Sequence, residues 1–358
     1  MNKNVLSLFL LTGIFLVSCT GKKENSSNII NQITVDTNDM TLDFYDNAPV
    51  YDLKGSTEID VSGEVEKTYH INFNDLPLRS VIVKEMIYDN AGKDSFVGAY
   101  RYDGYAIDDI INHIKIKKNP SNTLSTNIDL YLVISNDKGD SAVISWGEIF
   151  YPVHRHEIII ATKVMRIVPS KTKDLWPLPT ETKIVVASDL ITVRNINNPS
   201  HIAIHSVPFD ESTGGKKGDT AFVNQFIIYD NNKIVTAISS LPENYELHTY
   251  PTVFYGRGRG IHSVTPFNGI MLKDILQKYF TVNKNFLQHS LLLAAGNDGY
   301  RAAFSFSEIM NRNDQAEILL VELDKNTPDG GGKFRLFPAA DFFSDRSVKS
   351  LSFLKYFK

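Results

Sequence analysis

The chain has 358 residues, of which 42% are hydrophobic and 22% charged, so it can bury a substantial core over two domains. Its 37 basic and 41 acidic side chains give a formal net charge of −4 with histidine neutral, and this balance does not favour nucleic acid as a partner. The single cysteine excludes a disulfide within the chain, so stability must come from packing.

The N-terminal residues have the pattern of an export signal. One lysine is followed by an apolar run, Val5 to Val17, that is too short to span a bilayer comfortably. Residues 16–19, Leu-Val-Ser-Cys, resemble a bacterial lipobox, after which the signal is cut and the cysteine is acylated, for example with palmitate. We expect a signal peptide over 1–18, lipidation of Cys19 and a flexible polar tether over 19–50. The alternative is a buried cysteine in an uncleaved chain.

This expectation places the protein in the bacterial cell envelope, where the lipid would hold it to a membrane. We expect the outer membrane, with the direction in which the protein faces left open. The partners expected are the membrane itself and either a small anion or another envelope protein.

Several segments recur in a fixed order, which indicates an internal duplication. The segment "DGYAIDDII" from Asp103 recurs as "NGIMLKDIL" from Asn268. The segment "LYLVISNDKGDSAVISWGEIF" from Leu130 recurs as "LLLAAGNDGYRAAFSFSEIM" from Leu291. The other matched positions are Leu76-Pro77 with Leu241-Pro242, Glu157 with Glu317, and Asp189 and Arg194 with Asp341 and Arg346.

The duplication predicts a first domain over 51–207, a linker over 208–220 and a second domain over 221–358. In each domain we expect a short helix after the recurring glycine and then a hairpin, turned at Asn136-Asp137 or at Asn297-Asp298-Gly299. A Ser-x-x-Glu capping box should begin a second short helix. The expected fold class is α+β: two tandem, sheet-rich domains related by duplication.

Short motifs occur in the same order in both domains. They are Gly63-Glu64-Val65, Leu76-Pro77, Gly104 to Ile110 and Glu148 in the first, and Leu241-Pro242, Gly269 to Leu276, Asp298-Gly299-Tyr300, Glu308 and Arg335 to Pro338 in the second. This order resembles the molybdopterin-binding domain of the sulfite oxidase family. The resemblance spans both domains and implies that family's fold and its pterin pocket in each.

One residue type that the resemblance requires is absent. It implies a cysteine thiolate on molybdenum, a soft ligand for a sulfur-rich centre, between the Leu-Pro turn and the glycine helix. Neither corresponding stretch contains a cysteine and Cys19 lies at the anchor, which excludes molybdenum ligation by cysteine but leaves molybdopterin open. A second copy also stands where the family has an immunoglobulin-like domain. We therefore expect a binding protein without redox chemistry, and the alternative is a molybdopterin-dependent oxidoreductase without the cysteine ligand.

A glycine- and arginine-rich loop occupies the stretch where the family places its metal ligand. Glycine lets the backbone approach an anion, and arginine offers forked donors to phosphate or carboxylate. We expect this loop to bind a small anion, with a plain surface loop as the alternative. The candidate residues are Tyr255, Gly256, Arg257, Gly258, Arg259, Gly260 and His262.

Two pairs of histidines are candidate metal ligands. His154 and His156 would share one face of an extended strand, and so would His201 and His205. Neutral imidazole is a good donor to transition metals and haem, so a histidine-based metal- or haem-binding lipoprotein is a third hypothesis. The alternative is that these side chains lie on the solvent face of strands whose other face is apolar.

Overall fold

The structure, a computed structural model, describes residues 48–89, 92–169, 171–210, 222–323 and 332–358, which belong to one compact unit. The expected signal peptide, Cys19 and the tether up to residue 47 lie outside the described residues, as does most of the expected linker. No helix in the described ranges is long and apolar enough to cross a membrane.

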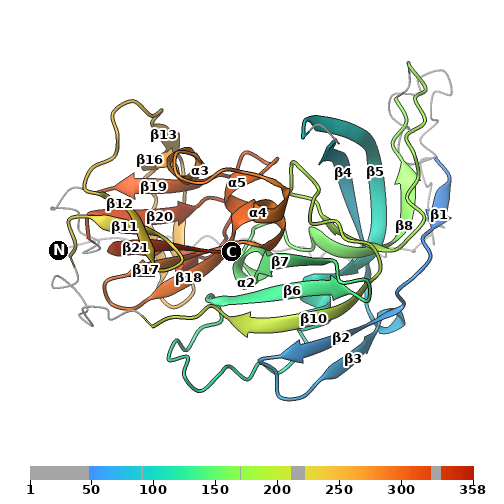
Figure 1. The fold of residues 1–358 in the computed structure, drawn as a ribbon, viewed down its shortest axis with the longest axis horizontal. Coiled ribbons are helices and arrows are strands. Elements are labelled where there is room, and N and C mark those ends of the chain that lie inside the picture. The colour runs from blue at the N-terminus through green and yellow to red at the C-terminus, as the bar shows by residue number, and fades with distance from the viewer. Residues whose placement is uncertain (1–47, 90–91, 170, 211–221, 324–331) are drawn as a thin grey trace, which may run out of the picture. The chain divides into compact units, whose positions relative to one another are not determined.

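The first half of the described chain forms two five-stranded sheets (Figure 1). One sheet has the order β1-β8-β5-β4, with β9 paired to β8, and consists of β1 (Val50–Asp52), β4 (Leu78–Tyr88), β5 (Asp94–Ala106), β8 (Ile158–Arg166) and β9 (Lys183–Val186). The other has the order β3-β2-β10-β6-β7 and consists of β2 (Glu58–Gly63), β3 (Tyr69–Asn72), β6 (Leu130–Asn136), β7 (Ser141–Ser145) and β10 (Pro199–Ser206).

The second half forms two further sheets and a two-stranded ribbon. The five-stranded sheet has the order β12-β11-β21-β17-β18 and consists of β11 (Phe226–Asp230), β12 (Lys233–Ile238), β17 (Leu291–Gly296), β18 (Arg301–Ser305) and β21 (Leu351–Phe357). The four-stranded sheet has the order β13-β16-β19-β20 and consists of β13 (His248–Tyr250), β16 (Phe267–Met271), β19 (Ile318–Glu322) and β20 (Phe334–Pro338). The ribbon pairs β14 (Phe254–Gly256) with β15 (Gly260–Ser263).

The two halves repeat one strand order. In the first half β2 runs parallel to β10, and β10, β6 and β7 follow as antiparallel neighbours. In the second half β11 runs parallel to β21, and β21, β17 and β18 follow in the same way. The expected hairpins are β6–β7 and β17–β18, so both are confirmed.

The helices are short. They are α1 (Ile107–Ile111), α2 (Trp146–Phe150), α3 (Leu272–Gln277), α4 (Lys284–His289) and α5 (Phe306–Met310), with 3-10 turns η1 (Phe73–Asp75) and η3 (Ser344–Arg346). Both expected capping boxes are present, Ser145 with Glu148 at α2 and Ser305 with Glu308 at α5.

The expected α+β class of the sulfite oxidase type is wrong. The fold is mainly β, with four small sheets in a β-propeller-like arrangement. Short helices were expected at the places of α1, α2, α3 and α5, whereas α4 was not expected, and all five have only five or six residues. One or two turns cannot form a layer that covers a sheet, so each helix adds only a few side chains to buried clusters that consist mainly of strand residues.

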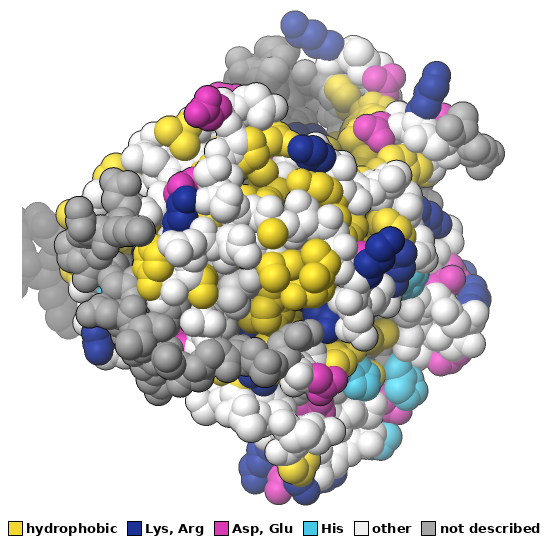
Figure 2. Space-filling view, turned by 60° about the vertical axis from the view of Figure 1, so that its left-hand side comes forward, with side chains coloured by type: hydrophobic (Ala, Val, Ile, Leu, Met, Phe, Trp, Pro, Cys, Tyr) yellow, Lys and Arg dark blue, Asp and Glu magenta, His cyan; other side chains and the backbone are white. Residues whose placement is uncertain are grey.

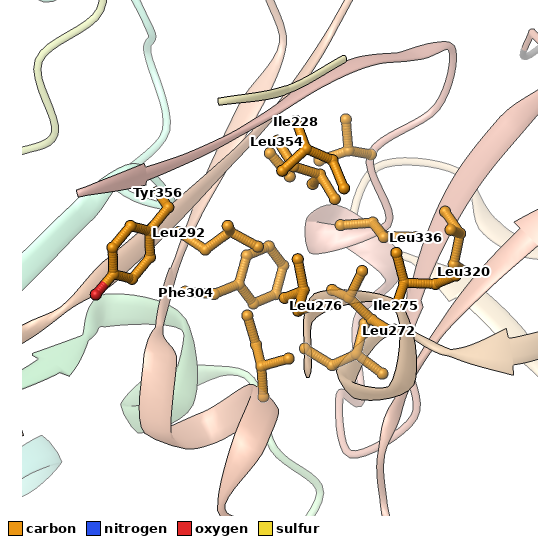
Figure 3. Close-up of a cluster of buried hydrophobic side chains, with 14 of the residues drawn as sticks. Ile228, Leu272, Ile275, Leu276, Leu292, Phe304, Leu320, Leu336, Leu354 and Tyr356 are labelled. Carbon is orange, nitrogen blue, oxygen red and sulfur yellow. The ribbon is translucent and has the colours of Figure 1, made fainter. Parts of the chain in front are cut away.

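The largest buried cluster lies mainly in the second half, where strands of both sheets and α3 contribute to it (Figure 3), and it also includes Ile128, Tyr151 and Ile191 of the first half. Leu292 of β17 and Leu354 of β21 face this cluster, together with Leu276 of α3. The alternate side chains of β17, such as Leu293, pack in a separate cluster with Val143 of β7. Strand β17 is therefore buried on both faces, which explains its unbroken apolar sequence and joins the two halves.

Candidate functional site

Two loops, one in each half, cross to the opposite half through the same kind of hydrogen bond. After α2, the backbone N–H of Val153 donates to the carbonyl oxygen of Ala340 at 2.8 Å. After α5, the N–H of Asn313 donates to the carbonyl oxygen of Ser188 at 2.9 Å. Val153 and Asn313 are equivalent positions, each five residues beyond its capping-box glutamate. The halves therefore face each other across an approximate two-fold axis, which we call the dyad.

A buried arginine joins two carboxylates on the first-half side of the dyad. Arg194 donates through Nε and Nη2 to the two oxygens of Asp189, at 2.8 and 2.7 Å. Its Nη1 donates to Oε1 of Glu148, on α2, at 2.9 Å. The guanidinium is fully buried, so these two carboxylates must compensate the loss of water around its positive charge.

The second half builds the same cluster from the matched residues. Arg346 donates through Nε and Nη2 to the two oxygens of Asp341, at 2.8 and 2.7 Å. Its Nη1 donates to Oε2 of Glu308, on α5, at 2.9 Å. Gly147 lies directly against this guanidinium, and a Cβ at that position would overlap with it.

The two clusters are bonded to each other across the dyad. The hydroxyl of Ser145, in the first half, donates to Oε1 of Glu308 at 2.8 Å. Nη1 of Arg194 donates to the hydroxyl oxygen of Ser305, in the second half, at 3.1 Å. The recurring charged residues thus form one buried network that links the two halves.

This network contains two arginines and four carboxyl groups, so it is short of positive charge. Burial, with a smaller contribution from the nearby Glu148 carboxylate, raises the pKa of Glu308 to about 7 against the opposing effect of Arg346. Burial also raises the pKa of Asp189 and of Asp341, although their arginines oppose the shift. We infer that the network holds a proton below neutral pH.

A pocket of about 370 Å³ opens beside the network, and both halves line it. We call it the dyad pocket. Its ionisable lining residues are Asp108, Glu148, His154, His156, Glu157, Arg312 and Asp314. The first five come from the first half and the last two from the loop after α5. Its volume is within the range of small-molecule sites.

His156 is held at the pocket wall by two aspartates of α1. Its Nδ1 lies 2.8 Å from Oδ1 of Asp108 and 3.8 Å from Oδ2 of Asp109. The other Asp108 oxygen accepts from Arg155 at 2.8 Å, and Arg79 holds Asp109. The backbone of His156 has a φ of 67°, a left-handed conformation that costs a non-glycine residue about 1 kcal/mol or more. These contacts hold the imidazole in one orientation.

Among the described residues, Asp108, Asp109 and His156 form the one group of histidine and acidic side chains that is compact enough to hold a metal ion. Their donor atoms lie within 4.8 Å of one another. Both aspartates are already paired with arginines, so a metal would have to compete with these ion pairs.

Glu157 lies next to His156 on the same wall. Its carboxyl group forms no hydrogen bond or ion pair within the described ranges, and burial raises its pKa. His154, which lies nearby, partly opposes this shift, whereas Asp314 adds to it. The exposed ring of His154 therefore faces a wall with an excess of carboxyl groups.

The second histidine pair lies elsewhere, on β10. His201 is exposed, with its Nε2 3.7 Å from an oxygen of Asp60. The ring of His205 packs against Tyr131 with 5.6 Å between ring centroids. Neither residue lines the dyad pocket. Within the described residues, the two expected histidine pairs therefore do not form a common site.

Arg257, in the glycine- and arginine-rich loop, is already engaged. Its Nη2 donates to the hydroxyl of Tyr151 at 2.7 Å, and its Nε lies 3.3 Å from an oxygen of Asp345. The guanidinium also lies over the rings of Tyr151 and Phe343, at 5.1 and 5.2 Å. Arg257 thus connects the second-half ribbon to the first half.

The rest of this loop belongs to the β14–β15 ribbon, in which Gly256 is buried. Arg259 and Gly258 are exposed, and Gly260 adopts a left-handed φ of 73° at the turn. The His262 ring packs against Gly256 and Phe254. The loop does not line the dyad pocket, although Tyr255 and His262 reach other, separate hollows.

One face of the molecule has a surface of mixed character. Figure 2 shows hydrophobic side chains gathered near the middle of one face, with basic and acidic side chains interspersed around them. Such a face does not by itself identify a ligand.

Sequence reasoning missed four residues of the pocket: Asp108, Glu157, Arg312 and Asp314. It matched Glu157 only as a repeated position and gave Glu148 only a structural role. A signal was available, since "HRHE" places two histidines directly before a glutamate that recurs as Glu317. The aspartate that completes the group lies on a different strand–helix unit, which the local pattern could not indicate.

No protein-family model matches the chain, and no curated protein matches it in sequence. The resemblance to the sulfite oxidase family therefore stays a prediction from short motifs, and the fold class expected from it is wrong.

Proposed function

We propose that this protein is a lipid-anchored envelope protein that binds a small polar ligand in the dyad pocket and performs no redox chemistry. The observation that carries the proposal is the pocket of about 370 Å³, which both halves line with ionisable side chains above a rigid buried network. Such a site needs both halves, which gives the duplication a functional reason.

The dyad pocket has more support as a ligand site than the loop at residues 256–260. Arg257 already makes an ion pair and two cation–π contacts, so an anion would have to displace Asp345. Arg259 remains exposed, and a single exposed arginine binds anions weakly. The membrane anchor in the proposal rests on residues 16–19 alone.

Filling the pocket tests the proposal. Ala316 and Ala340 line the pocket from the second half, and tryptophan at either position would occupy part of its volume. Thermal-shift screening of the full chain with amines, carboxylates, sugars and divalent metal ions should find a stabilising compound, and Ala316→Trp should abolish its effect. Gly258→Trp, at an exposed position that does not line the pocket, is the matched control. A compound that stabilises wild type and Ala316→Trp equally would contradict the proposal.

A second candidate function is binding of a transition metal by Asp108, Asp109 and His156, because their donor atoms are already close together. Imidazole with carboxylates is a common ligand set for zinc. Isothermal titration with zinc should then show a site that His156→Ala removes and that His205→Ala, on β10, leaves intact. Equal zinc binding by both variants would rule this candidate out.

A further inference from the structure

We propose that the ligand of the dyad pocket is a small organic cation, bound through a protonated amine by the carboxylates of Glu148 and Glu157. This inference rests on the proposed function and names the chemical class of the ligand.

The lining of the dyad pocket is rich in acidic side chains. Four carboxyl groups line the pocket. Asp108 is neutralised by Arg155, and Asp314 accepts from Nε of Arg312 at 2.8 Å. Glu148 shares the single charge of Arg194 with Asp189, and Glu157 has no ion pair within the described ranges. This excess of acidic groups favours a positively charged occupant.

One carboxylate oxygen of Glu148 has no hydrogen-bond donor within the described ranges. Its Oε1 accepts from the backbone N–H of Ser145 and from Arg194, but its Oε2 is buried and has no hydrogen-bond partner within the described ranges. The residue is only 9% exposed. A buried carboxylate oxygen without a donor is costly, so it is a ready acceptor for an N–H group of a ligand.

Glu157 is the second acidic side chain that faces the dyad pocket. Its carboxyl group also has no donor in the described part of the chain, and it lies on the same pocket wall as His156. An ammonium group has three N–H donors, so it can satisfy one carboxylate or bridge two.

The arrangement of Glu148 and Glu157 suits an organic cation better than a metal ion. A metal ion needs donor atoms about 2.0–2.6 Å from it, which places the donors within about 5 Å of one another. The described residues form one such group, and it includes neither Glu148 nor Glu157. The pocket is also large enough for several non-hydrogen atoms.

Isothermal titration of the full chain with matched probes tests the inference. Butylamine and putrescine carry ammonium groups, butanediol is a neutral counterpart and succinate is an anionic one. We expect the amines to bind and the other two not to bind. Glu157→Gln keeps the shape but removes the charge, and should weaken amine binding by about tenfold or more. The control is Glu66→Gln, an exposed ion-pair residue outside the pocket.

The possible failures are distinguishable. If succinate or butanediol binds and Ala316→Trp blocks it, the proposed function holds but the cation inference is wrong. If an amine binds equally to wild type, Glu157→Gln and Ala316→Trp, its site is elsewhere and both proposals fail. If neither amine binds at millimolar concentrations, the cation inference is overturned.

Discussion

Replacing Glu308 by glutamine should flatten the dependence of stability on pH. In the folded protein, burial and the Glu148 carboxylate raise the pKa of Glu308 from 4.5 to about 7. A carboxyl group whose pKa is raised by folding contributes stability that is fully present below the unfolded pKa and is lost as pH rises through the folded pKa. The window is therefore from pH 4.5 to about 7, and the unfolding free energy should fall across it.

The size of this effect follows from the shift. Each unit of pKa corresponds to about 1.4 kcal/mol, so Glu308 should contribute on the order of 3 kcal/mol across the window. Glutamine does not titrate, but it fits the same space and can still accept from Ser145. The expected result is that the unfolding free energy falls more steeply with pH in the wild type than in Glu308→Gln, whatever their absolute stabilities. The raised pKa values of Asp189 and Asp341 act in the same direction in both proteins and cancel in the comparison.

Urea unfolding at a series of pH values, followed by tryptophan fluorescence, measures the effect. Trp146 lies on α2 next to the network and should report its loss. The control is Glu66→Gln, whose exposed side chain should leave the wild-type slope unchanged. Parallel pH profiles for wild type and Glu308→Gln between pH 4.5 and 7 would refute the reasoning, and so would a wild-type stability that rises with pH in that window.

Three further predictions concern single positions. Gly147→Ala should lower the unfolding free energy, measured by urea titration, by about 1–3 kcal/mol because its Cβ would overlap with the buried Arg346. Gly258→Ala, in open space, should change it by less than about 0.5 kcal/mol. Arg257→Gln should lower the melting temperature because it removes an ion pair and two cation–π contacts, and an equal effect of Arg259→Gln, at an exposed position, would contradict this. Cys19→Ala should move the protein from the detergent phase to the aqueous phase on detergent phase separation, and unchanged partitioning would argue against lipidation.

The local elements of this protein follow from its sequence alone. The hairpins at Asn136 and Asn297 and the capping boxes at Ser145 and Ser305 were all predicted correctly. Each depends on residues within about a dozen positions of one another, so turn chemistry and apolar periodicity are sufficient to specify it. The recurrence of segments likewise anticipated that the two halves repeat one strand order.

The fold class and the site were decided by tertiary packing. Local patterns predicted short helices at α1, α2, α3 and α5, but not that strands would dominate the core and give a mainly β fold. The sequence also paired Glu148 with Glu308 as equivalent positions, but the contact that matters joins Ser145 to Glu308 across the dyad. Similarly, His156 meets Asp108 only because α1 and the loop after α2 pack together. Such contacts join residues far apart in the chain, and local preferences cannot specify them because burial and hydrogen bonding select them only when the two halves close on each other.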